Sequence, residues 1–184
     1  NRIRDNFKIK RNYFTSIRRK ITITPVSKWL ASQARQSFLI YCDIQHIYNG
    51  IDISIFSPQT GNSVKRDYNI DGKFTIIGVA SAWSESKGFS EYYKLRERLS
   101  DRYAIIMVGL SQKQIDNLPS GIIGIKRTQS QQELAELYSA ADVVLSLSRA
   151  ETFGLTIAEG MACGTPAIVY NTTAIPELIT PNTG

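Results

Sequence analysis

From residue 74 onward the chain alternates between short β-rich runs and stretches with helical periodicity, and this alternation restricts the possible fold more than any other feature. Five runs combine β-branched and other apolar residues over the length of a buried strand. They cover residues 74–80, 104–108, 122–125, 143–147 and 167–170. A repeated strand–helix–strand order requires parallel strands with helices on both faces of the sheet. The sequence therefore predicts an α/β fold with a doubly wound, parallel, Rossmann-like sheet.

The segments between these runs carry helix signals. Apolar residues recur at three- and four-residue steps over 89–99 and 134–141, as on one face of an amphipathic helix. Boundary signals accompany the patterns: a capping box at Ser130 and Glu133, and a helix end at Cys163 followed by Gly164 and Pro166. A further short helix is expected over 174–179.

The first 72 residues are less regular, with short strands expected only at 21–24 and 44–48. We therefore predict three parts: a basic arm over 1–20, a linking segment over 21–72, and the Rossmann-like domain over 73–184. A doubly wound sheet of this kind commonly has six strands. Because five are found after residue 73, the domain is expected to be truncated at its C-terminus.

Charge is distributed unevenly along the chain. The formal net charge is +6, but residues 1–20 contain eight Lys or Arg against one acid, so the other 164 residues sum to −1. A neutral body is not typical of a nucleic-acid-binding domain, and we expect no nucleic-acid partner. The basic arm could contact an anionic membrane or another polyanion, or be a solvated end.

The sequence lacks the motifs that would identify several other classes of protein. The sequence contains neither G-x-x-x-x-G-K-[ST] nor G-x-G-x-x-G, and it has no Asp-x-Asp pair for a divalent metal. His46 lies in a predicted strand segment, where a catalytic role is not favoured, and Cys42 and Cys163 are interpreted as core residues. With no apolar run of about 20 residues and no secretory signal, a cytoplasmic protein is expected. Because the motifs for metal and cofactor binding are also missing, we expect neither a metal nor a cofactor.

The chemistry is expected where two loops meet. In the strand order 3-2-1-4-5-6, the first and fourth strands are neighbours, and ligands bind at their carboxyl ends. The loop after the first strand brings Lys87, and the loop after the fourth brings Glu151 and a helix start at Gly154. A helix N-terminus and an ammonium group together suit a phosphate. Glu159, eight residues after Glu151, can face the same ligand from within the helix.

These residues carry a resemblance. The run 134–167, L-x-x-L-Y-x-x-A-D-V-V-L-S-L-S-x-x-E-T-F-G-L-x-x-x-E-G-M-A-C-G-T-P-A, resembles the donor-binding signature of retaining nucleotide-sugar glycosyltransferases of family 4. Further matches are Lys87-Gly88, Asn49-Gly50-Ile51-Asp52 with Phe56, and Thr24-Pro25-x-Ser27-x-Trp29-Leu30. The resemblance covers about 21–184 and implies the C-terminal, donor-binding half of a two-domain GT-B enzyme. Residues 1–20 would then be the remnant of the N-terminal acceptor domain.

The resemblance also implies roles for single residues. Lys87 would neutralise the donor diphosphate, Glu159 would hold the ribose hydroxyls, and Glu151 would contact the donor sugar; Lys87 and Glu151 are the expected catalytic residues. The remaining donor-binding residues implied are Phe153, Gly154 and Leu155 through backbone amides, and Lys126 and Arg127 near the base. The expected activity is metal-independent hexosyl transfer from a UDP- or GDP-linked sugar to a glycan or lipid-linked acceptor. For a bacterial enzyme of polysaccharide synthesis, residues 1–20 would face the inner side of the plasma membrane.

One departure keeps an alternative open. Members of the family commonly carry an arginine shortly before the lysine, whereas Ser81, Ala82 and Trp83 occupy that stretch here. Arg149 could replace it, and Trp83 is interpreted as a packing residue. The alternative is a non-catalytic nucleotide-binding or scaffolding module. In either case, residues 1–184 alone are expected to bind a nucleoside diphosphate without transferring sugar.

Overall fold

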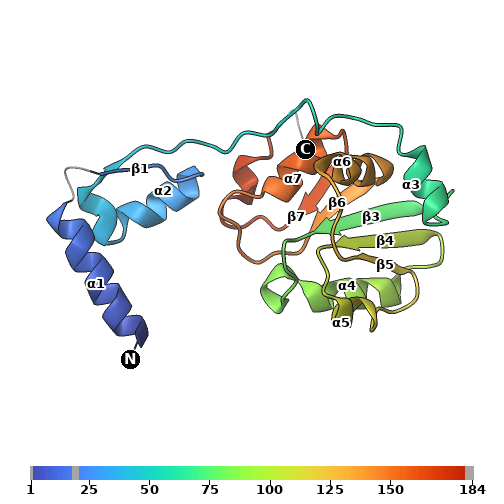
Figure 1. The fold of residues 1–184 in the computed structure, drawn as a ribbon, viewed down its shortest axis with the longest axis horizontal. Coiled ribbons are helices and arrows are strands. Elements are labelled where there is room, and N and C mark those ends of the chain that lie inside the picture. Colours follow the sequence, from blue (N-terminus) through green and yellow to red (C-terminus); the bar gives the residue numbers. More distant parts are fainter. Residues whose placement is uncertain (1, 18–20, 181–184) are drawn as a thin grey trace.

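The computed structural model describes residues 2–17 and 21–180 and contains a five-stranded parallel sheet (Figure 1). Its strands are β3 (Phe74–Val79), β4 (Tyr103–Val108), β5 (Ile122–Ile125), β6 (Val143–Ser146) and β7 (Ala167–Val169). They are ordered β5-β4-β3-β6-β7, which is 3-2-1-4-5 when the strands of this sheet are counted along the chain. The predicted neighbours, the first and fourth strands, therefore lie side by side as β3 and β6. The doubly wound α/β fold is confirmed.

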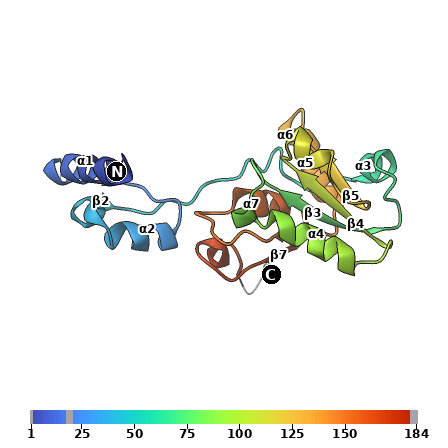
Figure 2. The same cartoon turned by 90° about the horizontal axis from the view of Figure 1, so that it is seen from below.

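Helices cover both faces of the sheet (Figures 1 and 2). One face packs against α6 and α7, together with α3, and the other against α4 and α5. The bounds are α3 (Asn62–Asp67), α4 (Phe89–Arg98), α5 (Gln112–Ile115), α6 (Gln131–Ala140) and α7 (Leu155–Ala162). Because successive strand residues point to opposite faces, Ile77 packs in the α6 core while Ile76 packs in the α4 core. This two-sided burial explains why the central strands are continuous apolar runs.

Most of the expected elements are found close to their predicted bounds, but a capping box and a short helix differ. The capping box expected at Ser130 is only half formed: Ser130 Oγ accepts from the Glu133 N–H at 3.1 Å, but the Glu133 carboxylate accepts from the Gln129 N–H at 2.5 Å. A complete capping box instead opens α5, at Ser111 and Gln114. The helix expected over 174–179 is a single 3₁₀ turn, η4 (Ile175–Glu177), with Pro176 at its start, where proline is tolerated.

The first part of the chain forms an N-terminal unit, defined here as residues 2–17 and 21–48. It contains α1 (Arg2–Ser16), β1 (Thr22–Ile23), α2 (Lys28–Arg35), the 3₁₀ helix η2 (Phe38–Tyr41) and β2 (Asp43–Ile44). The two strands pair with each other in parallel, apart from the main sheet. Figures 1 and 2 show the unit beside the sheet, joined to it by an extended segment. Among the described residues, no helix is long and apolar enough to span a bilayer.

The structure also tests the expectations for several single residues. The strand predicted over 44–48 ends at Ile44, so His46 lies outside it, exposed and edge-on to the Tyr48 ring at 5.1 Å. Trp83 is a packing residue as predicted: it is buried, and its indole N–H donates to the Val108 carbonyl at 2.8 Å. Both cysteines are buried and unpaired with each other. Three basic residues of the predicted arm, Arg18, Arg19 and Lys20, lie outside the described residues.

Candidate functional site

A pocket of about 330 Å³ opens at the carboxyl ends of β3 and β6, where the direction of strand order reverses. This is the position at which doubly wound sheets bind ligands. Six of the residues predicted for the site line it: Lys87, Glu151, Phe153, Gly154, Leu155 and Glu159. The structure therefore brings together side chains that are up to 72 residues apart in the sequence.

Lys87 and Glu151 pair with each other at the wall of the pocket. Lys87 ends the 3₁₀ turn η3 (Glu85–Lys87), and its Nζ lies 2.5 Å from Glu151 Oε1. The side chains are 33% and 20% exposed, so both can still be reached from the pocket. An anionic ligand at Lys87 would share the ammonium group with Glu151 or displace it.

Backbone contacts hold the two loops in place. The Arg149 N–H donates to the Ser86 carbonyl at 3.0 Å, which joins the loop after β6 to the loop after β3. The Glu151 N–H donates to Thr173 Oγ1, also at 3.0 Å. Arg149 itself is exposed and is not among the described residues that line the pocket, so the structure does not place it as a substitute for the family's arginine.

Gly154 directs the start of α7 into the pocket. Its φ of +99° is left-handed, and a Cβ there would lie 3.1 Å from Leu178 Cδ1 and 3.2 Å from Ile157 Cδ1. The first-turn N–H groups of a helix have no acceptor within the helix. With the positive end of the helix dipole, the amides around Leu155 therefore form a place for negative charge.

Glu159 lies one turn further along α7 and is partly buried. Its Oε2 accepts a hydrogen bond from the Tyr138 hydroxyl at 3.2 Å. Burial raises the pKa of Glu159, and the Tyr138 hydrogen bond opposes this only in part. Burial, and then the charge of Glu159, also raises the pKa of Tyr138, so the hydroxyl remains a donor.

Asn49 and Tyr138 are among the residues of the site that were not predicted from the sequence. Asn49 lines the pocket from the segment after the N-terminal unit, and Tyr138 fixes Glu159 from α6. The periodicity of α6 identifies Tyr138 only as a core residue, and it is fully buried. The sequence signal for Asn49 is its place in the Asn49–Asp52 motif, one of the matches that carry the family resemblance. That match assigns no role to Asn49.

Lys126 and Arg127 do not line this pocket. They line a second hollow of about 570 Å³ at the ends of β3, β4 and β5, which shares Ser81 with the first. Both side chains are exposed. The two hollows adjoin, so an elongated ligand could occupy both.

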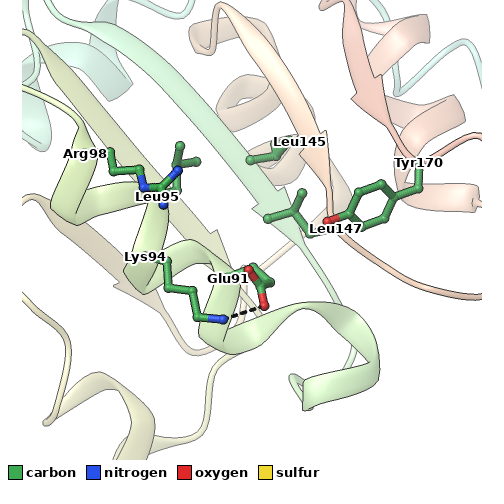
Figure 3. A pocket seen from close by; sticks show the side chains of 7 residues that line it. All are labelled: Glu91, Lys94, Leu95, Arg98, Leu145, Leu147 and Tyr170. Atoms are coloured by element: carbon green, nitrogen blue, oxygen red, sulfur yellow. Dashed lines mark hydrogen bonds and ion pairs between the residues drawn. The ribbon is translucent and has the colours of Figure 1, made fainter.

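A third hollow, of about 280 Å³, lies between α4 and the strands β6 and β7 (Figure 3). Its floor includes Leu145 and Leu147, and its polar rim includes the Glu91–Lys94 ion pair at 2.9 Å. None of the residues predicted for the site line it. Charged groups and a helix start converge on the pocket at β3 and β6 instead. We therefore take that pocket, and not this hollow, as the candidate functional site.

Curated glycosyltransferases are similar to this chain in sequence. N-acetyl-α-D-glucosaminyl L-malate synthase of Bacillus anthracis is 27% identical over 164 residues, which cover 85% of this chain and 43% of that protein. A GDP-mannose-dependent α-(1-6)-phosphatidylinositol dimannoside mannosyltransferase of Mycobacterium tuberculosis is 49% identical over 51 residues, 28% of this chain and 13% of that protein. The chain thus spans less than half the length of these curated relatives.

The chain shares its fold with a solved structure, and most of its sequence matches a defined family. HepE of Anabaena, solved in complex with UDP and glucose, superimposes with a TM-score of 0.74 at 21% identity, covering 96% of this chain and 50% of that one. Residues 62–184, which contain the whole five-stranded sheet and all the described residues that line the pocket except Asn49, match the family described as glycosyl transferases group 1. The chain therefore belongs to the glycosyl transferases group 1 family.

Proposed function

We propose that the chain is the donor-binding, C-terminal half of a retaining, metal-independent glycosyltransferase of family 4 and GT-B fold. The enzyme would transfer a sugar from a nucleoside-diphosphate sugar to a glycan or lipid-linked acceptor. One observation carries the proposal: Lys87, Glu151, Glu159 and the start of α7 converge on a single pocket at the carboxyl ends of β3 and β6. Since the chain spans less than half the length of its relatives, we expect it to bind donor without transferring sugar by itself.

Each group in the pocket suits one part of such a donor. The Lys87 ammonium and the amides of Phe153 to Leu155 would bind the diphosphate, which carries the negative charge. The Glu159 carboxylate would accept from the ribose hydroxyls, and Glu151 from the hydroxyls of the donor sugar. The base would lie in the adjoining hollow near Lys126 and Arg127.

The proposed catalysis is stabilisation of the leaving group. As the bond between the sugar C1 and the diphosphate oxygen breaks, negative charge grows on the diphosphate, and Lys87 and the α7 amides stabilise it more strongly in the transition state. The acceptor oxygen forms the new bond to C1 on the face that the diphosphate leaves, and its proton passes to a diphosphate oxygen. The configuration at C1 is therefore retained.

The relatives support two donor nucleotides. HepE was solved with UDP and glucose, whereas the mycobacterial relative is named for GDP-mannose. We therefore propose a UDP- or GDP-linked hexose as donor. We also propose that a bacterial enzyme of this kind acts at the cytoplasmic face of the membrane, where basic α1 could contact anionic lipid.

A second function is favoured by one feature. Ser81, Ala82 and Trp83 leave the loop after β3 without the second cation that a diphosphate would use. A non-catalytic nucleotide-binding or scaffolding module would tolerate this loss. Turnover by a longer protein containing this chain would contradict the scaffolding alternative.

A thermal-shift panel of UDP, GDP, ADP and CMP tests the donor-binding function directly. A ligand present at 100 times its dissociation constant adds about 2.7 kcal/mol to the free energy of unfolding. We expect UDP or GDP to stabilise the chain more than CMP, because the diphosphate reaches both Lys87 and α7. If none of the four nucleotides changes the melting temperature, donor binding by this chain is wrong.

A further inference from the structure

Glu177 lies outside the pocket but contacts a part of the chain far away in the sequence. Its Oε2 accepts hydrogen bonds from the Lys28 N–H at 2.8 Å and from the Tyr48 hydroxyl at 2.9 Å. Its Oε1 accepts from the Trp29 N–H at 2.7 Å. Lys28, Trp29 and Tyr48 belong to the N-terminal unit, which stands beside the sheet in Figures 1 and 2. The carboxylate therefore connects this unit to the segment that follows β7.

At the start of α2, the free N–H groups of the helix match the acceptor oxygens of the Glu177 carboxylate. The N–H groups of Lys28 and Trp29 belong to the first turn, where the helix offers them no acceptor. The next N–H group, that of Leu30, donates to Ser27 Oγ at 3.1 Å. Burial alone would raise the pKa of Glu177, but the Trp29 and Lys28 amides and the Tyr48 hydroxyl outweigh it, so its pKa is lowered. A charged carboxylate at a helix N-terminus is stabilising.

The segment that carries Glu177 also backs the donor pocket. Thr173 Oγ1 accepts from the Glu151 N–H at 3.0 Å. Leu178 lies behind Gly154, where an added Cβ would come within 3.1 Å of its Cδ1. Ile175, between them, is fully buried. Residues 173–178 therefore join the loop of Glu151 to the N-terminal unit.

The N-terminal unit reaches the same pocket from the other side. The Tyr48 ring lies 6.1 Å from the Phe153 ring, centroid to centroid, at an interplanar angle of 44°. The next residue, Asn49, lines the pocket. The hydrogen bond from the Tyr48 hydroxyl to Glu177 thus fixes the ring that sits on Phe153.

We propose that Glu177 is a positioning residue for the donor pocket: by holding the start of α2 and the Tyr48 hydroxyl, it sets Tyr48 and Asn49 against the loop of Glu151 and Phe153. Glu177 does not touch the ligand and acts through Tyr48. The proposal rests on the proposed function only for the identity of the ligand, since the contacts of Glu177 with α2 do not depend on it.

Hydrogen exchange, followed by NMR on the 184-residue chain without ligand, tests the contact. Glu177→Gln keeps the size of the side chain but loses its charge and one acceptor oxygen. We expect the amides of Lys28 and Trp29 to exchange about tenfold faster and their proton shifts to move upfield. Glu97→Gln is the matched control, because Glu97 is exposed on α4, and it should change neither. Unchanged exchange and shifts at Lys28 and Trp29 in Glu177→Gln would overturn the proposal.

Two further measurements test positioning. Tyr48→Phe removes only the hydroxyl, so we expect the amide shifts of Asn49 and Phe153 to change while Lys28 and Trp29 remain protected from exchange. Calorimetry with UDP and GDP should give a dissociation constant about three- to tenfold higher for Glu177→Gln than for the parent chain, because the pocket wall must then be ordered on binding.

The outcomes separate the two proposals. If the parent chain binds neither nucleotide, the proposed function fails, while the exchange data still decide the role of Glu177. If Glu177→Gln loosens α2 but leaves both nucleotide affinity and exchange at the Glu151 amide unchanged, the positioning role is wrong and the contact is only structural.

Discussion

The ion pair between Lys87 and Glu151 brings opposite charges to the same wall of the pocket, and the two side chains should therefore respond differently to mutation. Lys87→Ala removes the cation expected to meet the diphosphate. A charge-assisted contact of this kind is worth about 1.5–3 kcal/mol, so the dissociation constant for a nucleoside diphosphate should rise about 10- to 100-fold, with the bare nucleoside little affected.

Lys94→Ala is the control for this measurement, because Lys94 also pairs with a glutamate but lies on α4, away from the pocket. Calorimetry with both ligands on both variants would check the prediction. Equal weakening of nucleoside and nucleoside diphosphate in Lys87→Ala would mean that Lys87 supports the fold or the base instead.

Mutations of Glu151 and Glu159 should have different effects, because the two glutamates are proposed to contact different parts of the donor. Glu159→Gln should weaken nucleoside-diphosphate binding by about 1–3 kcal/mol, since the ribose loses a charged acceptor. Glu151→Gln should leave this binding intact or tighter, because it frees Lys87 from its partner. Calorimetry of the two variants would check this. The reverse order of effects would exchange the proposed roles.

The buried position of Glu159 predicts a pH-dependent cost to stability. Its pKa is raised by burial, so the folded chain takes up the proton more readily than the unfolded chain. As pH rises from the usual glutamate value of 4.5 through the raised pKa, the folded state must hold a charge that burial disfavours. Glu159→Gln should therefore be more stable than the parent chain at pH 8, and this advantage should shrink as the pH falls through the raised pKa of Glu159.

Urea unfolding of the two chains at a series of pH values would measure this difference. Glu97→Gln, which changes an exposed carboxyl, should give a much flatter difference over the same range. An advantage of Glu159→Gln that grows as the pH falls would contradict the sign of the raised pKa.

At the scale of elements, the start of α7 depends on one glycine. In Gly154→Ala, a left-handed alanine costs about 1–2 kcal/mol, and its Cβ would press on Leu178 and Ile157. Gly50→Ala is the control, because no atom lies within 4 Å of a Cβ there. Urea unfolding should show a loss of stability in Gly154→Ala alone. Equal stability of both variants would show that α7 does not require the left-handed start.

The strands and helices of the sheet were predictable because each carries its own signal. β3 to β7 are apolar runs buried on both faces, and the rule for doubly wound sheets then placed β3 beside β6. The capping box was misassigned because Ser-x-x-Glu at 130–133 and Ser-x-x-Gln at 111–114 have the same local pattern. Only the position of the Glu133 carboxylate in the folded chain separates them.

The site was predictable where it lies on the loops after known strands and on α7, the helix that starts in the second loop. Lys87 and Glu151 follow β3 and β6 directly, so strand order brings them together. Tyr138 and Glu177 act through contacts across 21 and 149 residues of sequence, and no local pattern encodes those contacts. They emerge only from the packing of α6 on α7 and of the N-terminal unit on the segment after β7.

At the scale of the whole molecule, we expect a nucleoside diphosphate to bind at the junction of β3 and β6, between Lys87 and the start of α7. The most direct measurement is a titration of the isotopically labelled chain with UDP and GDP, followed by amide NMR shifts. We expect the largest shifts at Lys87–Gly88 and over 153–155. Shifts confined to the hollow beside α4 (Figure 3), at Glu91, Lys94 and Tyr170, would contradict it.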